Sequence, residues 1–487
     1  MKPSPAVVAV AAALSAPLVS AIHLAPRSEA SPRTLSLPIE RRHVPDILAH
    51  ERARLRKRQT SGTVEQTLDN DQSLYYANIT LGTPAQSLRL HIDTGSSDLW
   101  ANTASSSFCL ARTDNCEGGT YSSAQSSTYR LVNDLFNISY VDGSAAVGDY
   151  VTDTLGFGGV TLTDFQFGIG EVSSSSQGVL GIGYMSNEVQ VQRANLDPYP
   201  NLPQALVDAG HIASNAYSLW LNDLDASTGE ILFGGVNTEK YEGELATLPI
   251  LSEGGEYFEL SLALTGVTNA GSDLSSSSSF PTAVLLDSGA TLTYLPNDIT
   301  QEIYNSVQAV YQSDVGAAYA PCALASSSAT IDYSFSGVTI KVPYNELFLS
   351  AGTNNFGQPI TFTNGEEACL FGIAPAQSGM AVLGDTFLRS AYVVYDLSNN
   401  EISLAQTVFN STTDNIQMIT KGDNGVPNAT PVFDPVGDVS ATTGGARLGD
   451  SSATANPFNA GSKDKQASSM GAMVAAVFAI AATFVLS

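Results

Sequence analysis

Residues 88–100 read LRLHIDTGSSDLW, and residues 283–292 read AVLLDSGATL. In both stretches an apolar run typical of a buried strand leads into Asp, a hydroxyl residue and Gly, at Asp93 and at Asp287. The tripeptide alone is weak evidence for a functional carboxylate, because in most of its instances the Asp only accepts a hydrogen bond from a backbone amide of the turn. The context is stronger, since a strand holds the carboxylate rigidly and the hydroxyls and Gly amides supply the donors that a buried carboxylate needs.

A second element is also repeated. Val179-Leu180-Gly181 follows the first Asp turn, and Val382-Leu383-Gly384 follows the second. Two copies of strand, acidic turn and apolar-Gly segment predict two related lobes, and the interval between Asp93 and Asp287 is too long for a solenoid repeat.

The body between residues 59 and 406 alternates short apolar runs with Gly, Ser, Asn and Asp, which predicts an all-β fold. Strands are expected at 88–92, 150–155, 283–286 and 391–395, and helices only at 202–209 and 298–311. We expect an N-terminal catalytic lobe at 59–240 and a C-terminal one at 241–407.

If the lobes pack about a pseudo-twofold axis, the two carboxylates face each other and hold one proton between them. One then acts as the base on a water molecule while the other donates a proton to the scissile carbonyl. This chemistry cleaves an amide without a cofactor or a metal, and polypeptides are the expected substrates.

Four segments resemble the pepsin family of aspartic endopeptidases in order and spacing: residues 76–84 (YANITLGTP), the two Asp turns, and residues 382–389 (VLGDTFLR). The resemblance covers about 59–406 and implies a bilobal fold with an active-site cleft between the lobes. The two ends of the chain look most like those of the fungal GPI-anchored yapsin-type proteases.

The resemblance places Tyr140 at the tip of a flap hairpin that closes over substrate, with its hydroxyl bonded to the Trp100 indole. The remaining residues that it implies for the site form two groups. The flap residues that bind substrate are Asp142, Gly143 and Ser144, and the residues that support the dyad are Thr94, Gly95, Ser96, Trp100, Ser288, Gly289 and Thr291.

Two positions depart from the family's pattern. Ala290 stands where most relatives carry a hydroxyl, so we expect Ser96 to bond Asp93 while Asp287 lacks the equivalent donor, giving a less acidic optimum. Asp142 in the flap turn would pair with Lys or Arg of a substrate and favour cleavage next to basic residues. A turn Asp that bonds its own backbone is an equally good interpretation of Asp142.

The charge is very uneven along the chain. Residues 1–58 carry a net charge of +6 and residues 59–459 a net charge of −33. So acidic a body argues against nucleic acid as a partner, and the basic segment would be attracted to it near neutral pH. We expect a monomer.

Both ends look like processing signals. A signal peptide is expected at 1–21 and a basic propeptide at 22–58, ending in Arg56-Lys57-Arg58. A Ser/Thr/Asn-rich stalk is expected at 408–459, with a GPI-attachment signal at 460–487 and Asn459 as the attachment residue. Gly461 is the alternative residue, and a tail anchor the alternative to GPI. These signals predict the outer face of the cell membrane, or the cell wall, as the location.

Four cysteines suit an oxidising compartment, and local pairing of Cys109 with Cys116 and of Cys322 with Cys369 is the simplest of three connectivities. Their spacing does not fit a zinc site. Sequons at Asn78, Asn137, Asn410 and Asn428 are expected to be glycosylated.

Two rival functions remain open. One is a GPI-linked surface protein with an inactive protease fold, although such copies usually lose an Asp or its Gly. The other is a soluble digestive protease without an anchor.

Overall fold

The structure is a computed structural model that describes residues 34–41, 75–110, 116, 118–140, 144–226, 228–313, 316–353, 358–376 and 379–439. These residues form strands for the most part, which confirms the predicted all-β, bilobal pepsin-like class. Within the same residues no helix is both long enough and apolar enough to cross a membrane.

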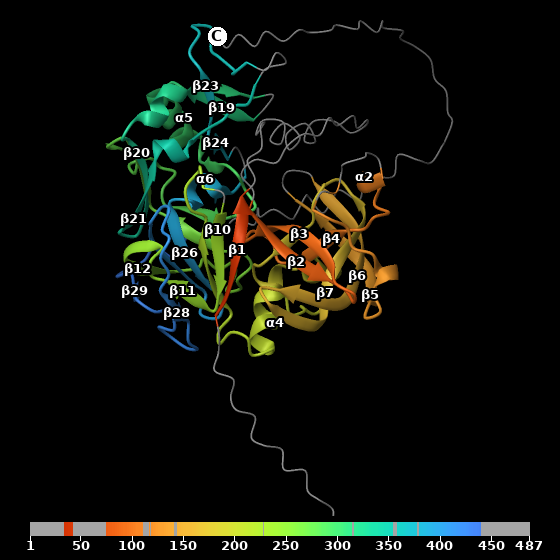
Figure 1. Cartoon of the computed structure of the whole chain (residues 1–487). Helices are drawn as coiled ribbons and strands as arrows, with labels where there is room; N and C mark the ends of the chain where they lie inside the picture. Colours follow the sequence, from red (N-terminus) through yellow and green to blue (C-terminus); the bar gives the residue numbers. More distant parts are fainter. Residues whose placement is uncertain are drawn as a thin grey trace, which may run out of the picture. The chain divides into compact units, whose positions relative to one another are not determined.

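The first lobe is built on the N-terminal strands, drawn in orange and yellow in Figure 1. These strands are β2 (Tyr75–Leu81), β3 (Gln86–Asp93), β4 (Leu99–Asn102), β5 (Arg130–Ser139), β6 (Ala145–Phe157), β7 (Val160–Ser173) and β8 (Val179–Gly181). The short helices of this half are α2 (Ser107–Leu110), α3 (Val189–Ala194) and α4 (Leu202–Asp208). The helix predicted at 202–209 is therefore present.

A single 14-stranded sheet joins the two halves in the order β29-β12-β27-β26-β9-β10-β1-β2-β3-β8-β4-β7-β6-β5. Its other strands are β1 (Leu35–Arg41), β9 (Ala216–Trp220), β10 (Thr228–Phe233), β12 (Tyr241–Pro249), β26 (Ala391–Asp396), β27 (Glu401–Thr407) and β29 (Ala429–Pro431). The red strand β1 stands between β10 and β2 in Figure 1. Part of the segment expected as a propeptide is thus a strand of the sheet that joins the lobes.

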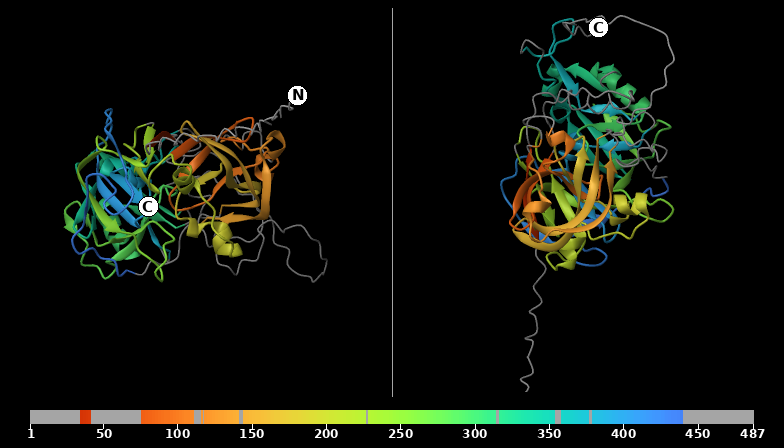
Figure 2. Two further views of the ribbon diagram at one scale, coloured as in Figure 1. Left: turned by 90° about the horizontal axis from the view of Figure 1, so that it is seen from below. Right: turned by 90° about the vertical axis from the view of Figure 1, so that its right-hand side faces the viewer.

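The second lobe adds smaller sheets, drawn in green and cyan in Figure 2. Their strands are β13 (Ser261–Leu264), β14 (Gly266–Asn269), β15 (Ser272–Asp273), β16 (Thr282–Leu286), β17 (Thr293–Leu295), β18 (Val310–Gln312), β19 (Ala317–Pro321), β20 (Thr330–Phe335), β21 (Val338–Pro343), β22 (Phe348–Leu349), β23 (Ala368–Phe371), β24 (Ile373–Pro375) and β25 (Ala381–Leu383). The helices are α5 (Asn297–Val307) and α6 (Asp385–Leu388). The expected helix 298–311 ends at Val307 because Gln308 adopts a left-handed conformation, and its last two expected residues belong to β18.

The internal repeat is present in the strand pairing. In the first lobe β3 runs parallel to β8, so that Asp93 lies opposite Gly181, and β4 pairs antiparallel with β8. In the second lobe β16 runs parallel to β25, and β17 pairs antiparallel with β25. Both Asp turns therefore leave the same kind of strand and are held by the same kind of neighbour.

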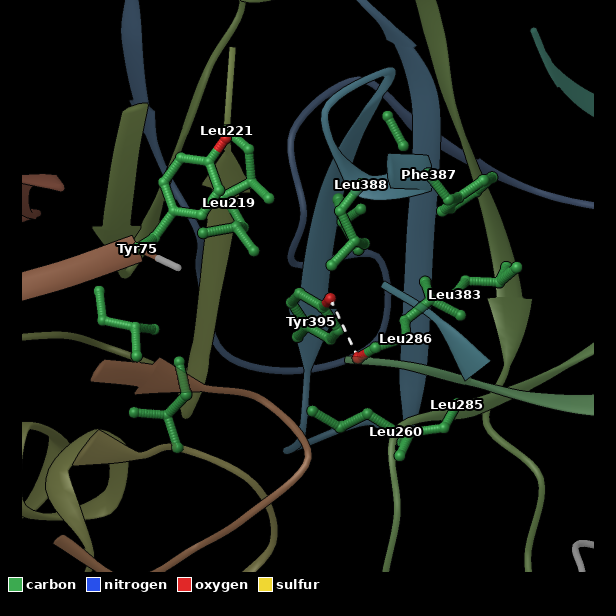
Figure 3. Close-up of a cluster of buried hydrophobic side chains, with 14 of the residues drawn as sticks. Tyr75, Leu219, Leu221, Leu260, Leu285, Leu286, Leu383, Phe387, Leu388 and Tyr395 are labelled. Atoms are coloured by element: carbon green, nitrogen blue, oxygen red, sulfur yellow. Dashed lines mark hydrogen bonds between the residues drawn. The ribbon is translucent and has the colours of Figure 1, made fainter. Parts of the chain in front are cut away.

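Apolar packing fixes the strand that carries the second Asp. Leu285 and Leu286 of β16, Leu383 of β25 and Tyr395 of β26 are buried together, as Figure 3 shows. Tyr395 also donates its hydroxyl to the Leu286 carbonyl at 3.5 Å. This core leaves the backbone just before Asp287 little freedom to move.

Residues 408–439 continue the fold beyond the lobe expected to end at 407. The strand β28 (Ile416–Met418) pairs with β11 (Gly235–Asn237), and β29 runs parallel to β12. Ile419 and Val426 are buried against Trp220 and Tyr392. Residues 408–439 are therefore part of the folded body and not of the stalk expected at 408–459.

Candidate active site

The two repeated aspartates end equivalent strands and are almost fully buried. Asp93 is the last residue of β3 and is 4% exposed, and Asp287 follows β16 and is 6% exposed. Each accepts a hydrogen bond in its own turn: Gly95 N–H donates to Asp93 Oδ1 at 2.8 Å, and Gly289 N–H donates to Asp287 Oδ1 at 2.7 Å. The two carboxylates are thus held by matching backbone donors.

The two carboxylates also face each other. A Cβ atom on Gly289 would lie 2.5 Å from Asp93 Oδ1 and 2.9 Å from Asp287 Oδ1, and one on Gly95 would lie 2.6 Å from Asp287 Oδ1. Both side chains therefore converge over the same two glycines. A larger residue at either position would push the pair apart.

A set of crossed hydrogen bonds locks one turn to the other. Thr94 donates its hydroxyl to the Leu286 carbonyl at 2.8 Å, and Ser288 donates its hydroxyl to the Ile92 carbonyl at 3.0 Å. The backbone amides complete the pattern: Ser288 N–H donates to Thr94 Oγ1 at 2.9 Å and Thr94 N–H to Ser288 Oγ at 3.2 Å. The relative position of Asp93 and Asp287 is therefore set by bonds between the two halves of the chain.

His91 adds a contact that sequence reasoning missed. It is buried, and its Nε2 lies 3.2 Å from the Ser288 carbonyl. Because a carbonyl only accepts, this hydrogen bond requires the proton on Nε2. Its place two residues before Asp93, on the same face of β3, is the signal that could have identified it.

The expected bond from Ser96 to Asp93 is wrong in this structure. Ser96 Oγ is buried and has no hydrogen-bond partner among the described residues. The expected bond is at the outer oxygen of Asp93, and the hydrogen bonds observed at the two carboxylates include those from the Gly95 amide to Asp93 Oδ1 and from the Gly289 amide to Asp287 Oδ1. Ala290 is buried, as is Thr291, whose Oγ1 likewise has no partner among the described residues. An asymmetry between the carboxylates that rests on a Ser96 bond therefore has no support.

Comparison with known proteins decides the family. The family model described as Eukaryotic aspartyl protease matches residues 74–407, which include both Asp turns. The chain belongs to this family. It is 56% identical to a protein of Aspergillus oryzae named "Probable aspartic-type endopeptidase opsB", over 86% of this chain and 85% of the relative. It is 40% identical to "Secreted aspartic protease 4" of Candida albicans, over 72% of this chain and 80% of the relative. The pepsin-like resemblance is thereby confirmed, and the protein is an aspartic-type endopeptidase.

The hairpin expected to be the flap of this aspartyl protease is formed by β5 and β6, which pair from Ser139 opposite Ala145 outward. Tyr140 N–H donates to the Ser144 carbonyl at 2.8 Å. The Trp100 indole N–H donates to the Tyr140 hydroxyl at 2.8 Å, as the resemblance implied. The two other flap residues, Asp142 and Gly143, lie outside the described residues.

Sequence reasoning also missed Asp98, which lies between the Asp93 turn and Trp100. It is fully buried and accepts hydrogen bonds from the hydroxyls of Tyr150 and Tyr199 and from the Val189 amide. Its donors come from three separate parts of the chain, so no local sequence pattern points to them.

Both predicted disulfides are confirmed: Cys109 pairs with Cys116, and Cys322 with Cys369. The asparagines of all four sequons, Asn78, Asn137, Asn410 and Asn428, are exposed. Within the described part of the chain no group of three or more His, Cys, Asp and Glu side chains could hold a metal ion. The expected signal peptide, the dibasic junction at 56–58, Asn459 and the tail 460–487 lie outside the described residues.

Proposed function

We propose that this aspartyl protease hydrolyses peptide bonds with Asp93 and Asp287 acting on one water molecule. The observation that carries the proposal is the convergence of two buried carboxylates over Gly95 and Gly289. Two like charges so close cannot both ionise freely, so the pair holds one proton. The ionised member takes a proton from water, the water oxygen attacks the scissile carbonyl carbon, and the protonated member donates to the carbonyl oxygen. The acid that took the water proton then gives it to the leaving nitrogen, a hydroxyl of the tetrahedral intermediate returns its proton to the other carboxylate, and the C–N bond breaks.

Burial and the crossed bonds support this role of the pair. The hydroxyls of Thr94 and Ser288 donate to backbone carbonyls of the opposite turn. They therefore fix the two turns relative to each other and do not donate to the carboxylates. A frame fixed before substrate binds needs little rearrangement in the transition state.

Tyr140 is the flap residue of the proposal. Its hydroxyl accepts from the Trp100 indole, and its side chain packs against the buried cluster that contains Trp100, Phe136 and Ile138. In this proposal the flap covers bound substrate and excludes water from the carboxylates.

Peptide hydrolysis between pH 3 and 7, with and without a statine-type inhibitor, tests the proposed chemistry. A statine hydroxyl mimics the tetrahedral intermediate, so we expect full inhibition across the active pH range. Activity that resists this inhibitor but is lost with a serine or metal-directed inhibitor would contradict the proposal.

A preference for basic residues next to the cleaved bond is a finer part of the proposal. It is supported by the net charge of −33 on residues 59–459 and by the place of Asp142 in the flap turn. Cleavage profiling of Asp142→Ala, with the exposed Asp134→Ala of the same hairpin as the matched control, tests it. We expect only Asp142→Ala to lose the Lys/Arg preference, and an unchanged preference would reject the ion pair.

For activation, we propose that residues 22–58 are removed after Arg58. Strand β1 is held by backbone pairing to β10 and β2, in addition to the charge attraction expected from the sequence. Replacing Lys57-Arg58 by two alanines should leave a longer chain that retains residues 35–41, which N-terminal sequencing would show. A normal mature N-terminus in that variant would contradict cleavage at this junction.

For location, we propose secretion and a GPI anchor at Asn459, with the protease displayed at the membrane or the wall. The sequence signals at both ends and the exposed sequons support it. Release of activity from cells by a phosphatidylinositol-specific phospholipase is the expected result. Activity only in the culture medium would favour the soluble protease instead.

A further inference from the structure

One buried carboxylate collects donors from three separate parts of the first lobe. Asp98 Oδ1 accepts from the Tyr150 hydroxyl at 2.6 Å and from the Tyr199 hydroxyl at 3.0 Å, and Asp98 Oδ2 accepts from the Val189 amide at 3.0 Å. Tyr150 belongs to β6, Tyr199 precedes α4, and Val189 begins α3. Asp98 itself is fully buried.

The backbone of Asp98 is hydrogen-bonded to the strand that pairs with the Asp93 strand. Its carbonyl accepts from the Gly181 amide at 3.1 Å, and Gly181 lies opposite Asp93 in the pairing of β8 with β3. Two residues further along, Trp100 bonds Tyr140. The segment from Asp93 to Trp100 therefore touches the flap hairpin at two points, through Asp98 and through Trp100.

Tyr150 links Asp98 to the flap hairpin. It lies in β6, whose first residue, Ala145, follows the flap turn, and its ring packs edge-on against Phe136 of β5 with centroids 5.3 Å apart. Phe136 in turn lies 6.3 Å from the Trp100 ring. One hydrogen bond from Tyr150 thus acts on both strands of the hairpin.

The bond between Tyr150 and Asp98 is well suited to hold a fixed position. Both partners are buried, so water cannot replace either of them at low cost. Burial, and then the negative charge of Asp98, raise the pKa of the Tyr150 hydroxyl, so it stays a donor over the working pH range. A short bond to a carboxylate is stronger than one between neutral groups.

We propose that Asp98 is a positioning residue for peptide hydrolysis: through Tyr150 it sets the place of the flap hairpin relative to the Asp93 turn. The inference rests on the proposed flap role of Tyr140. The competing interpretation is that Asp98 only satisfies buried donors and stabilises the lobe without any effect on substrate binding.

Two matched tyrosine variants separate these interpretations. Tyr150→Phe and Tyr199→Phe each remove one hydroxyl donor from the same oxygen of Asp98, but only Tyr150 belongs to the hairpin. A flap that is held less firmly loses binding shared by substrate and transition state, so KM rises while kcat is retained. We expect Tyr150→Phe to raise KM about fivefold, roughly the factor of one ordinary hydrogen bond, with kcat within about twofold of wild type.

Tyr199→Phe is expected to leave KM within about twofold of wild type, even if it lowers the melting temperature as much as Tyr150→Phe does. Equal KM changes in both variants, or an unchanged KM in Tyr150→Phe, would overturn the proposal. Asp98→Asn keeps one oxygen acceptor for Tyr150, so its KM should lie between those of wild type and Tyr150→Phe.

A spectroscopic readout covers the case of low activity. The chain has two tryptophans, so in a Trp220→Phe background the fluorescence reports Trp100 alone. Titration with a statine-type inhibitor should reach half-saturation at about fivefold higher concentration in Tyr150→Phe and at an unchanged concentration in Tyr199→Phe. Equal titration curves for the two variants would overturn the proposal.

Tyr140→Ala separates the failure of this inference from the failure of the flap role. If Tyr140→Ala raises KM but Tyr150→Phe does not, only the role of Asp98 is wrong. If Tyr140→Ala leaves KM unchanged, the flap role itself is wrong and the inference about Asp98 falls with it.

Discussion

Thr94 and Ser288 bond each other across the two halves of the chain. Ser288 N–H donates to Thr94 Oγ1 at 2.9 Å, and Thr94 N–H donates to Ser288 Oγ at 3.2 Å. Each hydroxyl also reaches a carbonyl of the other turn. Because the residues stand directly after Asp93 and Asp287, the pairing of the carboxylates depends on these contacts.

Thr94→Val should therefore lower kcat more than it raises KM. It keeps the shape of the side chain but removes the hydroxyl that donates to Leu286 and accepts from Ser288. We expect a loss in kcat of about tenfold or more, because small displacements of positioned groups slow the chemical step. Thr94→Ser keeps the hydroxyl and is the control. Equal kinetics for Thr94→Val and Thr94→Ser would contradict the role of the crossed bonds.

Ser96→Ala should leave the pH dependence of hydrolysis nearly unchanged. Ser96 Oγ makes no hydrogen bond to Asp93 within the described structure, so its removal takes no donor from the carboxylate. We expect the acid limb of the kcat/KM profile to move by less than about 0.3 pH units. A clear shift to higher pH would restore the original expectation that this hydroxyl favours the ionised form of Asp93.

The contribution of Asp396 and Glu401 to stability should fall as the pH rises from about 4 towards 7. Burial raises the pKa of Asp396, against the opposing effect of hydrogen bonds from Asn399. Burial, and then the nearby charge of Asp396, raise the pKa of Glu401, which lies opposite on β27. The folded chain therefore keeps protons that the unfolded chain has already lost. This stabilisation is fully present below the ordinary pKa values of the two carboxyls, and it is lost as the pH rises through their raised pKa values in the folded chain.

Asp396→Asn tests this sign, because Asn cannot ionise and still offers an acceptor to Asn399. Melting temperatures at pH 4 and pH 7 should differ less in Asp396→Asn than in wild type. The exposed Asp208→Asn serves as the control and should behave as wild type. A larger fall between pH 4 and pH 7 in Asp396→Asn would show that the sign is wrong.

Residues 408–439 should behave as part of the catalytic body. Ile419 is fully buried against the cluster that contains Trp220, so Ile419→Ala should lower the free energy of unfolding by about 2–4 kcal/mol. Lys421 of the same segment is exposed, so Lys421→Ala should change the free energy of unfolding by less than about 0.5 kcal/mol. Denaturant unfolding compares the two variants. A smaller loss for Ile419→Ala than for Lys421→Ala would contradict the packing of this segment.

The strand-Asp-turn units and their partners at 179–181 and 382–384 could be predicted, because periodicity and turn chemistry are local properties of the chain. The pairing of Trp100 with Tyr140 required a family resemblance, since it joins residues of separate strands. The Asp98 cluster could not be found, because its donors come from residues 150, 189 and 199 and meet only in the folded lobe. The expectation for Ser96 is wrong because a hydroxyl near a carboxylate in sequence need not point towards it, and here Ser96 Oγ has no hydrogen-bond partner among the described residues.

Replacing Asp93 and Asp287 separately by Asn tests the shared role of the two carboxylates most directly. Each variant keeps the shape of the turn and removes one of two facing acids, so neither should unfold at a lower temperature than wild type. We predict that kcat/KM for peptide hydrolysis falls by at least about a thousandfold in both variants, while the exposed Asp208→Asn keeps full activity. Retention of more than about a tenth of wild-type activity in either folded variant would contradict a mechanism that needs both acids.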